Sequence, residues 1–361
     1  MDLNALLKSA VDSGATDMHL KLGLPPVVRL DGQLGALEGW SPLTEADLET
    51  VLVGITERTP QRLEGFRATG ELDTSYMAPD LARFRVNGFK QRGSTSFAFR
   101  MIPTEVPGFE HLGLPKGVQR LAEEHRGLIL VTGATGAGKT TTLASMIGHI
   151  NRTRRQHIVT IEDPIEILHR DELASINQRE VGQDTESFLT ALRAALRQDP
   201  DVILIGEMRD SETVRAALQA AETGHLVMST LHTVDATETV NRVIDFFPPY
   251  QQKQVRLALA GTLRGIICQR LVPTIDGGRT PGLEILINTG RVAERIADPD
   301  KTHEIKDVIQ EGGYYGMVTF DQSLLQLLQE GKITVEDAMK AVSNQHDFQL
   351  AMQQAGIPIP V

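Results

Sequence analysis

Apolar residues in the first hundred positions follow two different periods. Those within residues 3–10 recur at helical spacing, whereas residues 26–30 and 82–86 alternate between apolar and polar in the manner of strands. This mixture predicts a small α+β domain over residues 1–102. Proline and glycine punctuate the next segment, which has few periodic apolar positions and predicts a linker over residues 103–117.

From residue 127 onward, apolar strands alternate with helical patterns. Strands are predicted at 128–132, 157–161, 202–205 and 226–229, and helices at 140–151, 188–198 and 211–221. Continuous apolar strands separated by helices predict a parallel sheet covered on both faces, here over residues 118–290. After Pro248 the pattern is mostly helical. Capping-box sequences at Thr319 and Thr334 predict a helical C-terminal region over residues 291–361.

The sequence predicts a phosphate-binding loop directly after the strand at 128–132. Residues 133–140 match the pattern G-x-x-x-x-G-K-[ST] in full, between a predicted strand and a predicted helix. In such a loop the backbone N–H groups turn toward phosphate oxygens, and the lysine offsets phosphate charge. The Thr140 hydroxyl would bind Mg²⁺. The predicted nucleotide-binding residues are Gly133, Thr135, Gly136, Ala137, Gly138, Lys139, Thr140 and Thr141.

Acidic residues follow two other predicted strands. Hydrolysis of a nucleotide needs a metal ligand and a group that orients water, and both commonly lie at the ends of neighbouring parallel strands. Glu207 directly follows one strand and is the candidate Mg²⁺ ligand. Glu162, Asp163 and Glu166 follow the strand after the phosphate-loop helix. A solvated loop is the simpler alternative for these three acids, but their position favours a catalytic role.

His225 and His232 flank a further predicted strand of the same sheet. A lone histidine is more often structural than catalytic. Because both flank one strand of the nucleotide-binding sheet, we interpret the two as sensors of the γ-phosphate, with a structural role as the alternative.

Composition and charge narrow the class of protein. Of the 361 residues, 41% are hydrophobic and 23% are charged, which is typical of a soluble globular protein. The net charge of −11 lacks the broad basic footprint of a nucleic-acid-binding protein, so no stable nucleic-acid binding is expected. No apolar run is long enough for a transmembrane segment, and no signal peptide opens the chain, which predicts a cytoplasmic protein. The single cysteine, Cys268, is expected to be a buried small hydrophobe without a redox or metal role.

With these segments in order, the chain resembles the secretion and pilus motor ATPases, most closely the PilT-type retraction ATPases of bacterial type IV pili. The shared segments are the phosphate loop, the acidic segment 162–166, the Walker B segment 206–210 and the His box 224–233. The likeness extends over at least residues 5–290. It implies a PAS-like domain before the linker, a RecA-like P-loop domain after it, and a homohexamer that hydrolyses ATP with Mg²⁺ to power pilus retraction and twitching motility.

The resemblance also implies roles for single residues. Glu166 would activate the attacking water, and Glu207 would be the Mg²⁺-associated Walker B residue. The N-terminal domain would supply arginines to the γ-phosphate, with Arg85 and Arg100 as the best matches and Arg83 and Arg92 as alternatives. The implied partner is a pilus platform protein of the inner membrane, which would hold the motor peripherally at the inner face of that membrane.

Two observations bear on the direction of the motor. Extension-type relatives usually carry a tetracysteine zinc insert and an extra N-terminal domain, and the single cysteine here favours retraction. However, residues 290–297 depart from the family's Ala-Ile-Arg-Asn-Leu-Ile-Arg-Glu and keep only the helical spacing of Val292 and Ile296. A pilus extension or type II secretion ATPase, or a low-turnover nucleotide-dependent accessory of another pilus motor, therefore stays an alternative. A DNA translocase is disfavoured by the charge.

Overall fold

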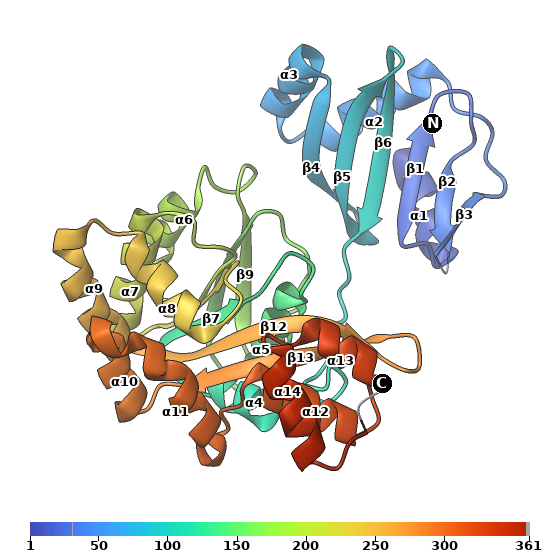
Figure 1. Cartoon of the computed structure of the whole chain (residues 1–361). Helices are drawn as coiled ribbons and strands as arrows, with labels where there is room; N and C mark the ends of the chain where they lie inside the picture. The colour runs from blue at the N-terminus through green and yellow to red at the C-terminus, as the bar shows by residue number, and fades with distance from the viewer. Residues whose placement is uncertain (31, 359–361) are drawn as a thin grey trace. The chain divides into compact units, whose positions relative to one another are not determined.

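The computed structural model describes residues 1–30 and 32–358, which form two compact units (Figure 1). The first comprises Met1–Thr104 together with Pro164–Leu168, and the second comprises Glu105–Asp163 and His169–Val361. The chain therefore returns briefly to the first unit from within the second.

The N-terminal unit is an antiparallel sheet of six strands in the order β3-β2-β1-β6-β5-β4, with three helices. Its strands are β1 (Asp17–Lys21), β2 (Val27–Leu30), β3 (Gln33–Ala36), β4 (Glu71–Ala78), β5 (Ala82–Gln91) and β6 (Ser94–Met101), and its helices are α1 (Leu3–Asp12), α2 (Glu45–Thr56) and α3 (Pro60–Thr69).

One face of this sheet forms the core of the unit. Leu7 of α1, Leu52 of α2 and Phe66 of α3 are buried together with Phe84 and Phe99 of the sheet. Because side chains alternate along a strand, the residues between these core positions point to the opposite face. That face carries exposed polar side chains, and the predicted arginines are among them.

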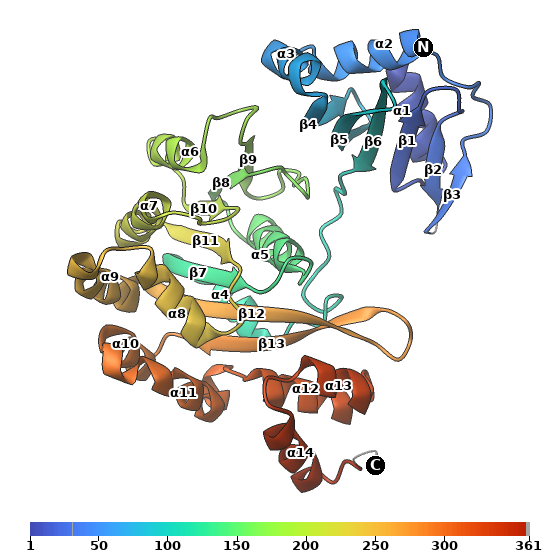
Figure 2. The same ribbon diagram turned by 45° about the horizontal axis from the view of Figure 1, so that its top comes forward.

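The C-terminal unit contains a sheet of seven strands in the order β13-β12-β7-β11-β10-β8-β9 (Figure 2). All neighbouring pairs are parallel except β12 and β13. The strands are β7 (Gly127–Thr132), β8 (His157–Glu162), β9 (Ser175–Glu180), β10 (Val202–Ile205), β11 (Leu226–Leu231), β12 (Leu263–Pro273) and β13 (Arg279–Ile287). The fold is thus α/β with one antiparallel and one mixed sheet.

Helices cover both faces of the mixed sheet. One core joins Val118 of α4 and Ile147 of α5 to the strands, and a second core on the opposite face joins Leu192 of α6 and Val214 of α7 to them. The predicted covering of both faces is confirmed. The helices of this unit up to the turn at residue 311 are α4 (Lys116–Ala122), α5 (Lys139–Thr153), α6 (Phe188–Ala195), α7 (Ser211–Glu222), α8 (Ala236–Asp245), α9 (Pro249–Thr262), α10 (Gly290–Ala297), the 3₁₀ turn η1 (Pro299–Glu304) and α11 (Ile305–Glu311).

The mostly helical pattern expected after Pro248 is wrong for residues 263–287, which form the hairpin of β12 and β13. β12 begins directly after α9 with no turn residue between them, and a continuous apolar run does not show by its periodicity whether it is helix or strand. The hairpin places β12 beside β7, and it buries Cys268 completely, as expected. The phosphate-loop strand is therefore an interior strand, flanked by β11 and β12.

Helices and short turns follow the hairpin through the rest of the described residues. Thr319 and Gln322 form the predicted capping box at the start of α12, and the Thr334 side chain caps α13. Phe348 of α14 is buried against these helices and Val272 of β12. The elements are η2 (Gly313–Tyr315), α12 (Phe320–Gln329), α13 (Val335–Ala341) and α14 (Gln345–Gln354). Among all helices of the described residues, not one combines the length and the apolar character that crossing a bilayer requires.

Candidate nucleotide-binding site

The phosphate-loop motif forms the connection between β7 and α5. Residues 133–138 link the two elements, and Lys139 is the first residue of the helix. Gly138 adopts a left-handed conformation with a φ of +89°, which side chains other than glycine rarely tolerate. A helix that begins at such a turn presents its unpaired N–H groups and its positive dipole end to the loop. The geometry therefore provides an anion-binding cradle at the predicted position.

Gln269 of β12 packs against the phosphate loop and its helix. The sequence pattern did not predict this residue as part of the site. Its side-chain oxygen accepts a hydrogen bond of 2.8 Å from the Thr142 hydroxyl, and only 3% of the residue is exposed. A side chain at Gly133 would collide with the backbone oxygen of Gln269, and one at Gly138 would come within 2.7 Å of its amide nitrogen. Gln269, about 130 positions further along the chain, thus leaves no space for a side chain at either loop glycine.

Lys139 begins a chain of polar contacts that crosses the end of the sheet. Its ammonium group donates to the backbone oxygens of Gly133 at 2.8 Å and Ala134 at 3.1 Å, and it lies 3.5 Å from Nδ1 of His232. Nε2 of His232 lies 3.0 Å from the Glu207 carboxylate, whose other oxygen pairs with Arg209 at 2.8 Å. The structure therefore brings together the predicted Lys139, His232 and Glu207, and it adds Arg209.

The electrostatic surroundings keep the Glu207 carboxylate ionised. Burial raises the pKa of Glu207, but the hydrogen bond and positive charge of Arg209, together with the contact to His232, lower it more strongly, so the pKa lies below its ordinary value. An ionised carboxylate at this point is a ready oxygen donor for a divalent cation.

His225 lies at the other end of β11. Leu231 of this strand pairs with Thr132, next to the phosphate loop, whereas the backbone oxygen of His225 accepts from Gly127 at the start of β7. Five residues of extended strand separate the two ends by about 17 Å, at roughly 3.3 Å per residue. The His225 ring contacts the backbone oxygen of Ala220 at 2.9 Å. The structure does not bring His225 to the phosphate loop.

The three acids after β8 have different environments. Glu162 is buried, and one of its oxygens accepts hydrogen bonds from Thr160 at 2.6 Å and Gln178 at 3.1 Å. Asp163 is exposed and lines a cavity together with Glu207 and Arg209. Glu166 is exposed and belongs to the segment Pro164–Leu168, which groups with the N-terminal unit.

Arg85 and Arg100 are brought together within the N-terminal unit. They are cross-strand partners on the open face of its sheet, and each is held by a carboxylate. Arg85 pairs with Asp73 at 3.0 Å, and Arg100 pairs with Asp17 at 2.8 Å. Two like charges directly opposite each other are unfavourable unless counter-charges hold them. This row presents exposed guanidinium groups that are oriented in advance.

A cavity of about 780 Å³ opens beside the phosphate-loop helix. Gly138, Thr141 and Thr142 line one side, and Gln269 and Arg279 of the hairpin line another. Its volume lies in the range of ligand pockets that bury small molecules. A ligand whose phosphates occupied the loop would have room for a nucleoside here.

Comparisons with known proteins show the family of the chain. The model of the type II/IV secretion system protein family matches residues 82–353. The chain belongs to this family. It is 43% identical to the type IV pilus retraction ATPase PilT of Pseudomonas aeruginosa, over 96% of this chain and all of that relative, and 40% identical to the type IV pilus ATPase PilU of the same organism, over 98% and 92%. The crystal structure of the pilus retraction motor PilT with bound ADP superposes with a TM-score of 0.87 at 45% identity, covering 97% and 99% of the two chains.

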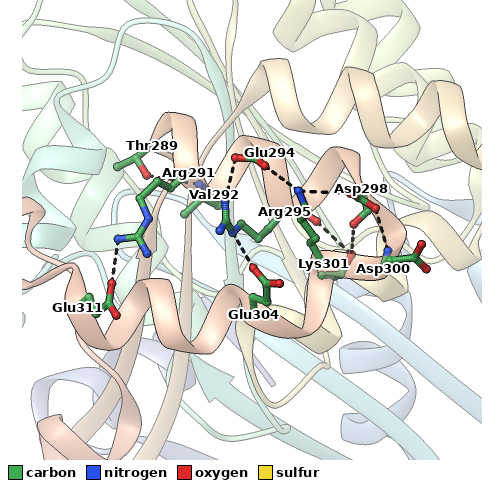
Figure 3. Close-up of polar contacts among 11 residues, drawn as sticks. Thr289, Arg291, Val292, Glu294, Arg295, Asp298, Asp300, Lys301, Glu304 and Glu311 are labelled. Atoms are coloured by element: carbon green, nitrogen blue, oxygen red, sulfur yellow. Dashed lines mark hydrogen bonds and ion pairs between the residues drawn. The ribbon is translucent and has the colours of Figure 1, made fainter.

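The segment that departs from the sequence usual in this PilT-type branch is nevertheless well ordered by contacts. α10 buries Val292 and Ile296, as their spacing predicts, whereas Arg291 and Glu294 are exposed and Arg295 is half-buried. Arg295 pairs with Glu304 at 3.1 Å, and Arg291 pairs with Glu311 at 2.9 Å (Figure 3). Ion pairs therefore connect α10 to η1 and to α11, so the altered sequence retains a defined helical structure.

Proposed function

We propose that this chain is the ATP-hydrolysing motor subunit of a type IV pilus retraction machine. The observation that carries the proposal is the contact chain from Lys139 through His232 to Glu207 beside the phosphate loop. It joins a group that neutralises phosphate charge to a carboxylate that holds a cation, and phosphoryl transfer depends on such positioning and charge stabilisation. Overall similarity to PilT supports ATP as the nucleotide and pilus retraction as the biological function.

The donor set fits Mg²⁺. Within the described residues, no cluster of three or more His, Cys, Asp or Glu side chains could enclose a metal ion by itself. Mg²⁺ characteristically takes one or two protein oxygens together with substrate phosphates and water. The Thr140 hydroxyl and the Glu207 carboxylate would be those oxygens. The ion would neutralise part of the negative charge of the phosphates.

The other predicted residues complete the proposed reaction. Lys139 leaves its loop carbonyl partners for phosphate oxygens, and His232 holds Glu207 in place while it reports on the γ-phosphate. Glu166 accepts a proton from the attacking water. Arg85 and Arg100 stabilise the charge that develops on the transferred phosphoryl group. The nucleoside of ATP occupies the cavity that Thr141 lines.

The proposed assembly follows the family resemblance. The N-terminal unit would be a PAS-like domain over residues 1–102, joined by a linker to a RecA-like core over 118–290 and a helical region over 291–361. Six copies would form a ring, located in the cytoplasm at the inner face of the membrane, where they act on a pilus platform protein. ATP would couple to force because γ-phosphate contacts exist in one arrangement of the units and not in the other.

A phosphate-release assay tests the enzymatic part. The purified protein should hydrolyse ATP only with Mg²⁺, and Lys139→Ala should abolish turnover, whereas Lys8→Ala, which removes an exposed i,i+4 ion pair with Asp12, should not. Turnover by the Lys139→Ala protein at the parental rate would refute the assignment.

Deletion of the gene tests the biological direction. A retraction motor predicts cells that keep many pili and do not twitch. Loss of pili would instead indicate an extension ATPase, and unchanged pili and twitching with negligible ATPase activity would indicate an accessory protein.

A further inference from the structure

Glu284 is a carboxylate inside the protein that the proposed chemistry does not use. It lies on β13, only 5% of it is exposed, and burial of the side chain raises its pKa above the ordinary value. Its Oε1 accepts a hydrogen bond of 2.9 Å from the backbone N–H of Ala236, the first residue of α8. A buried acidic side chain is costly unless it has a defined partner, and here the partner is a helix N-terminus.

The start of α8 leads directly back to the contact chain of the nucleotide site. Only three residues separate Ala236 from His232. Within them, the Asp235 side chain caps the helix through Glu238 at 2.7 Å, and the backbone N–H of Val234 donates to the Glu238 side chain at 2.9 Å. Residues 232–236 therefore form a turn that is fastened at its helical end.

A second fastening reaches the residue next to the histidine. The hydroxyls of Thr233 and Thr239 lie 2.6 Å apart, and the Thr239 hydroxyl also donates to the backbone oxygen of Asp235 at 2.6 Å. The His232 ring itself is 52% exposed, so packing alone does not fix its orientation between Lys139 and Glu207. The orientation of the ring therefore also depends on how the backbone of residues 232–236 is fixed.

We propose that Glu284 is a positioning residue for His232, acting through the start of α8. The inference rests on the proposed ATPase function, because it assigns Glu284 a part in the same site. By this role the β12–β13 hairpin supports the site twice: Gln269 braces the phosphate loop, and Glu284 braces the turn that carries the histidine. Removing the acceptor oxygen would let the imidazole drift from the contact chain while the phosphate loop stays intact.

A double-mutant cycle with His232 separates this role from a purely structural one. Glu284→Gln keeps an acceptor oxygen and should retain kcat within about twofold, whereas Glu284→Leu should lower kcat about tenfold, the effect of losing one hydrogen bond of this kind. The KM for ATP should change little in both. In a His232→Ala background, Glu284→Leu should cause no further loss of kcat.

Ser323→Ala is the matched control, because the Ser323 hydroxyl accepts from the backbone of Leu283 at 3.1 Å, one residue from Glu284 on the same strand. It should leave kcat unchanged. If Glu284→Leu does not fold, as judged by thermal melting, Thr239→Val replaces it in the cycle with the same expectation. An equal loss of kcat with and without His232, or an equal loss in Ser323→Ala, would overturn the role of Glu284. A parental protein that does not hydrolyse ATP would instead overturn the proposed function and this role with it.

Discussion

The imidazole of His232 lies 3.0 Å from the carboxylate of Glu207, and the two residues follow the ends of β10 and β11, which are neighbouring parallel strands of the mixed sheet. Their contact is possible because β10 and β11 end at the same edge of the sheet, beside the phosphate loop. Because Arg209 and His232 both contact Glu207 at this edge, they lower the pKa of its carboxyl group. The effect can be measured as a pH dependence of stability.

We expect the Glu207 contacts to make stability depend on pH on the acid side. The folded-state pKa of Glu207 lies below its ordinary value of 4.5, so the ionised form is favoured by folding. This stabilisation is complete above pH 4.5 and is lost as the pH falls through the lowered folded-state value. Thermal melting at a series of pH values should show a shallower acid decline for Glu207→Gln than for the parental protein. Glu222→Gln, on the exposed side of α7, is the control, and an identical decline in all three proteins would contradict the expectation.

Replacing Glu166 by glutamine should separate binding from turnover. We expect nucleotide affinity to be kept and kcat to fall at least about 100-fold, because a positioned general base contributes at least that factor. The measurements are binding of a fluorescent nucleotide and steady-state phosphate release. Glu172→Gln changes an exposed acid nearby in the sequence and should leave both unchanged. Parental turnover in Glu166→Gln would show that another group activates water.

Arg85→Gln and Arg100→Gln should each lower kcat by at least about tenfold, because an arginine that stabilises transferred phosphoryl charge contributes this much or more. The N-terminal unit should stay folded, since both side chains are exposed and form only surface ion pairs. Arg67→Gln removes a comparable exposed pair with Glu49 and serves as the control. If all three variants keep the parental kcat, the γ-phosphate contacts lie with other arginines, Arg83 being the next candidate.

The hydrogen bond between Gln269 and Thr142 predicts a non-additive pair of substitutions. Gln269→Leu leaves the buried Thr142 hydroxyl without its acceptor, which should cost about 1–3 kcal/mol in the free energy of unfolding and weaken nucleotide binding. Adding Thr142→Val removes the stranded hydroxyl and should restore part of the stability. Urea unfolding of the two single variants and the double variant measures the coupling. A purely additive double variant would mean that the hydroxyl finds another partner.

Arg295 and Arg291 allow a half-buried ion pair to be compared with an exposed one on the same helix, α10 (Figure 3). The Arg295 side chain is 18% exposed and hydrogen-bonded to Glu304, whereas Arg291 is 57% exposed in its pair with Glu311. Arg295→Met should destabilise the protein by about 1.5–3 kcal/mol, the usual contribution of a hydrogen bond to a charged group, and Arg291→Met by clearly less. High salt should remove the effect of Arg291→Met and leave most of the effect of Arg295→Met. Equal losses would show that the burial of Arg295 does not strengthen its ion pair, and no loss in either variant would show that the apolar face alone holds α10.

The phosphate loop and its flanking elements could be predicted because one motif fixes residue type, spacing and context together. β7 and α5 lie where the sequence indicates, and the apolar positions Val292 and Ile296 are buried as their spacing requires. Gln269 could not be predicted. Its role depends on β12 lying next to β7, a pairing between segments about 130 residues apart that no local pattern records. His225 precedes β11 and the phosphate loop follows β7, and the two strands are parallel, so His225 lies at the opposite edge of the sheet from the loop. This placement gives no support to its predicted role as a sensor of the γ-phosphate.

The order of the strands also has a consequence for synthesis. The phosphate-loop strand β7 lies between β11 and β12, and β12 is among the last strands to leave the ribosome. A nascent chain that ends before residue 263 contains the complete nucleotide motif but neither Gln269 nor Glu284, so the edge of β7 that pairs with β12 is still open. Competence to hold nucleotide should therefore arise late in translation, in one step, when the hairpin closes the gap.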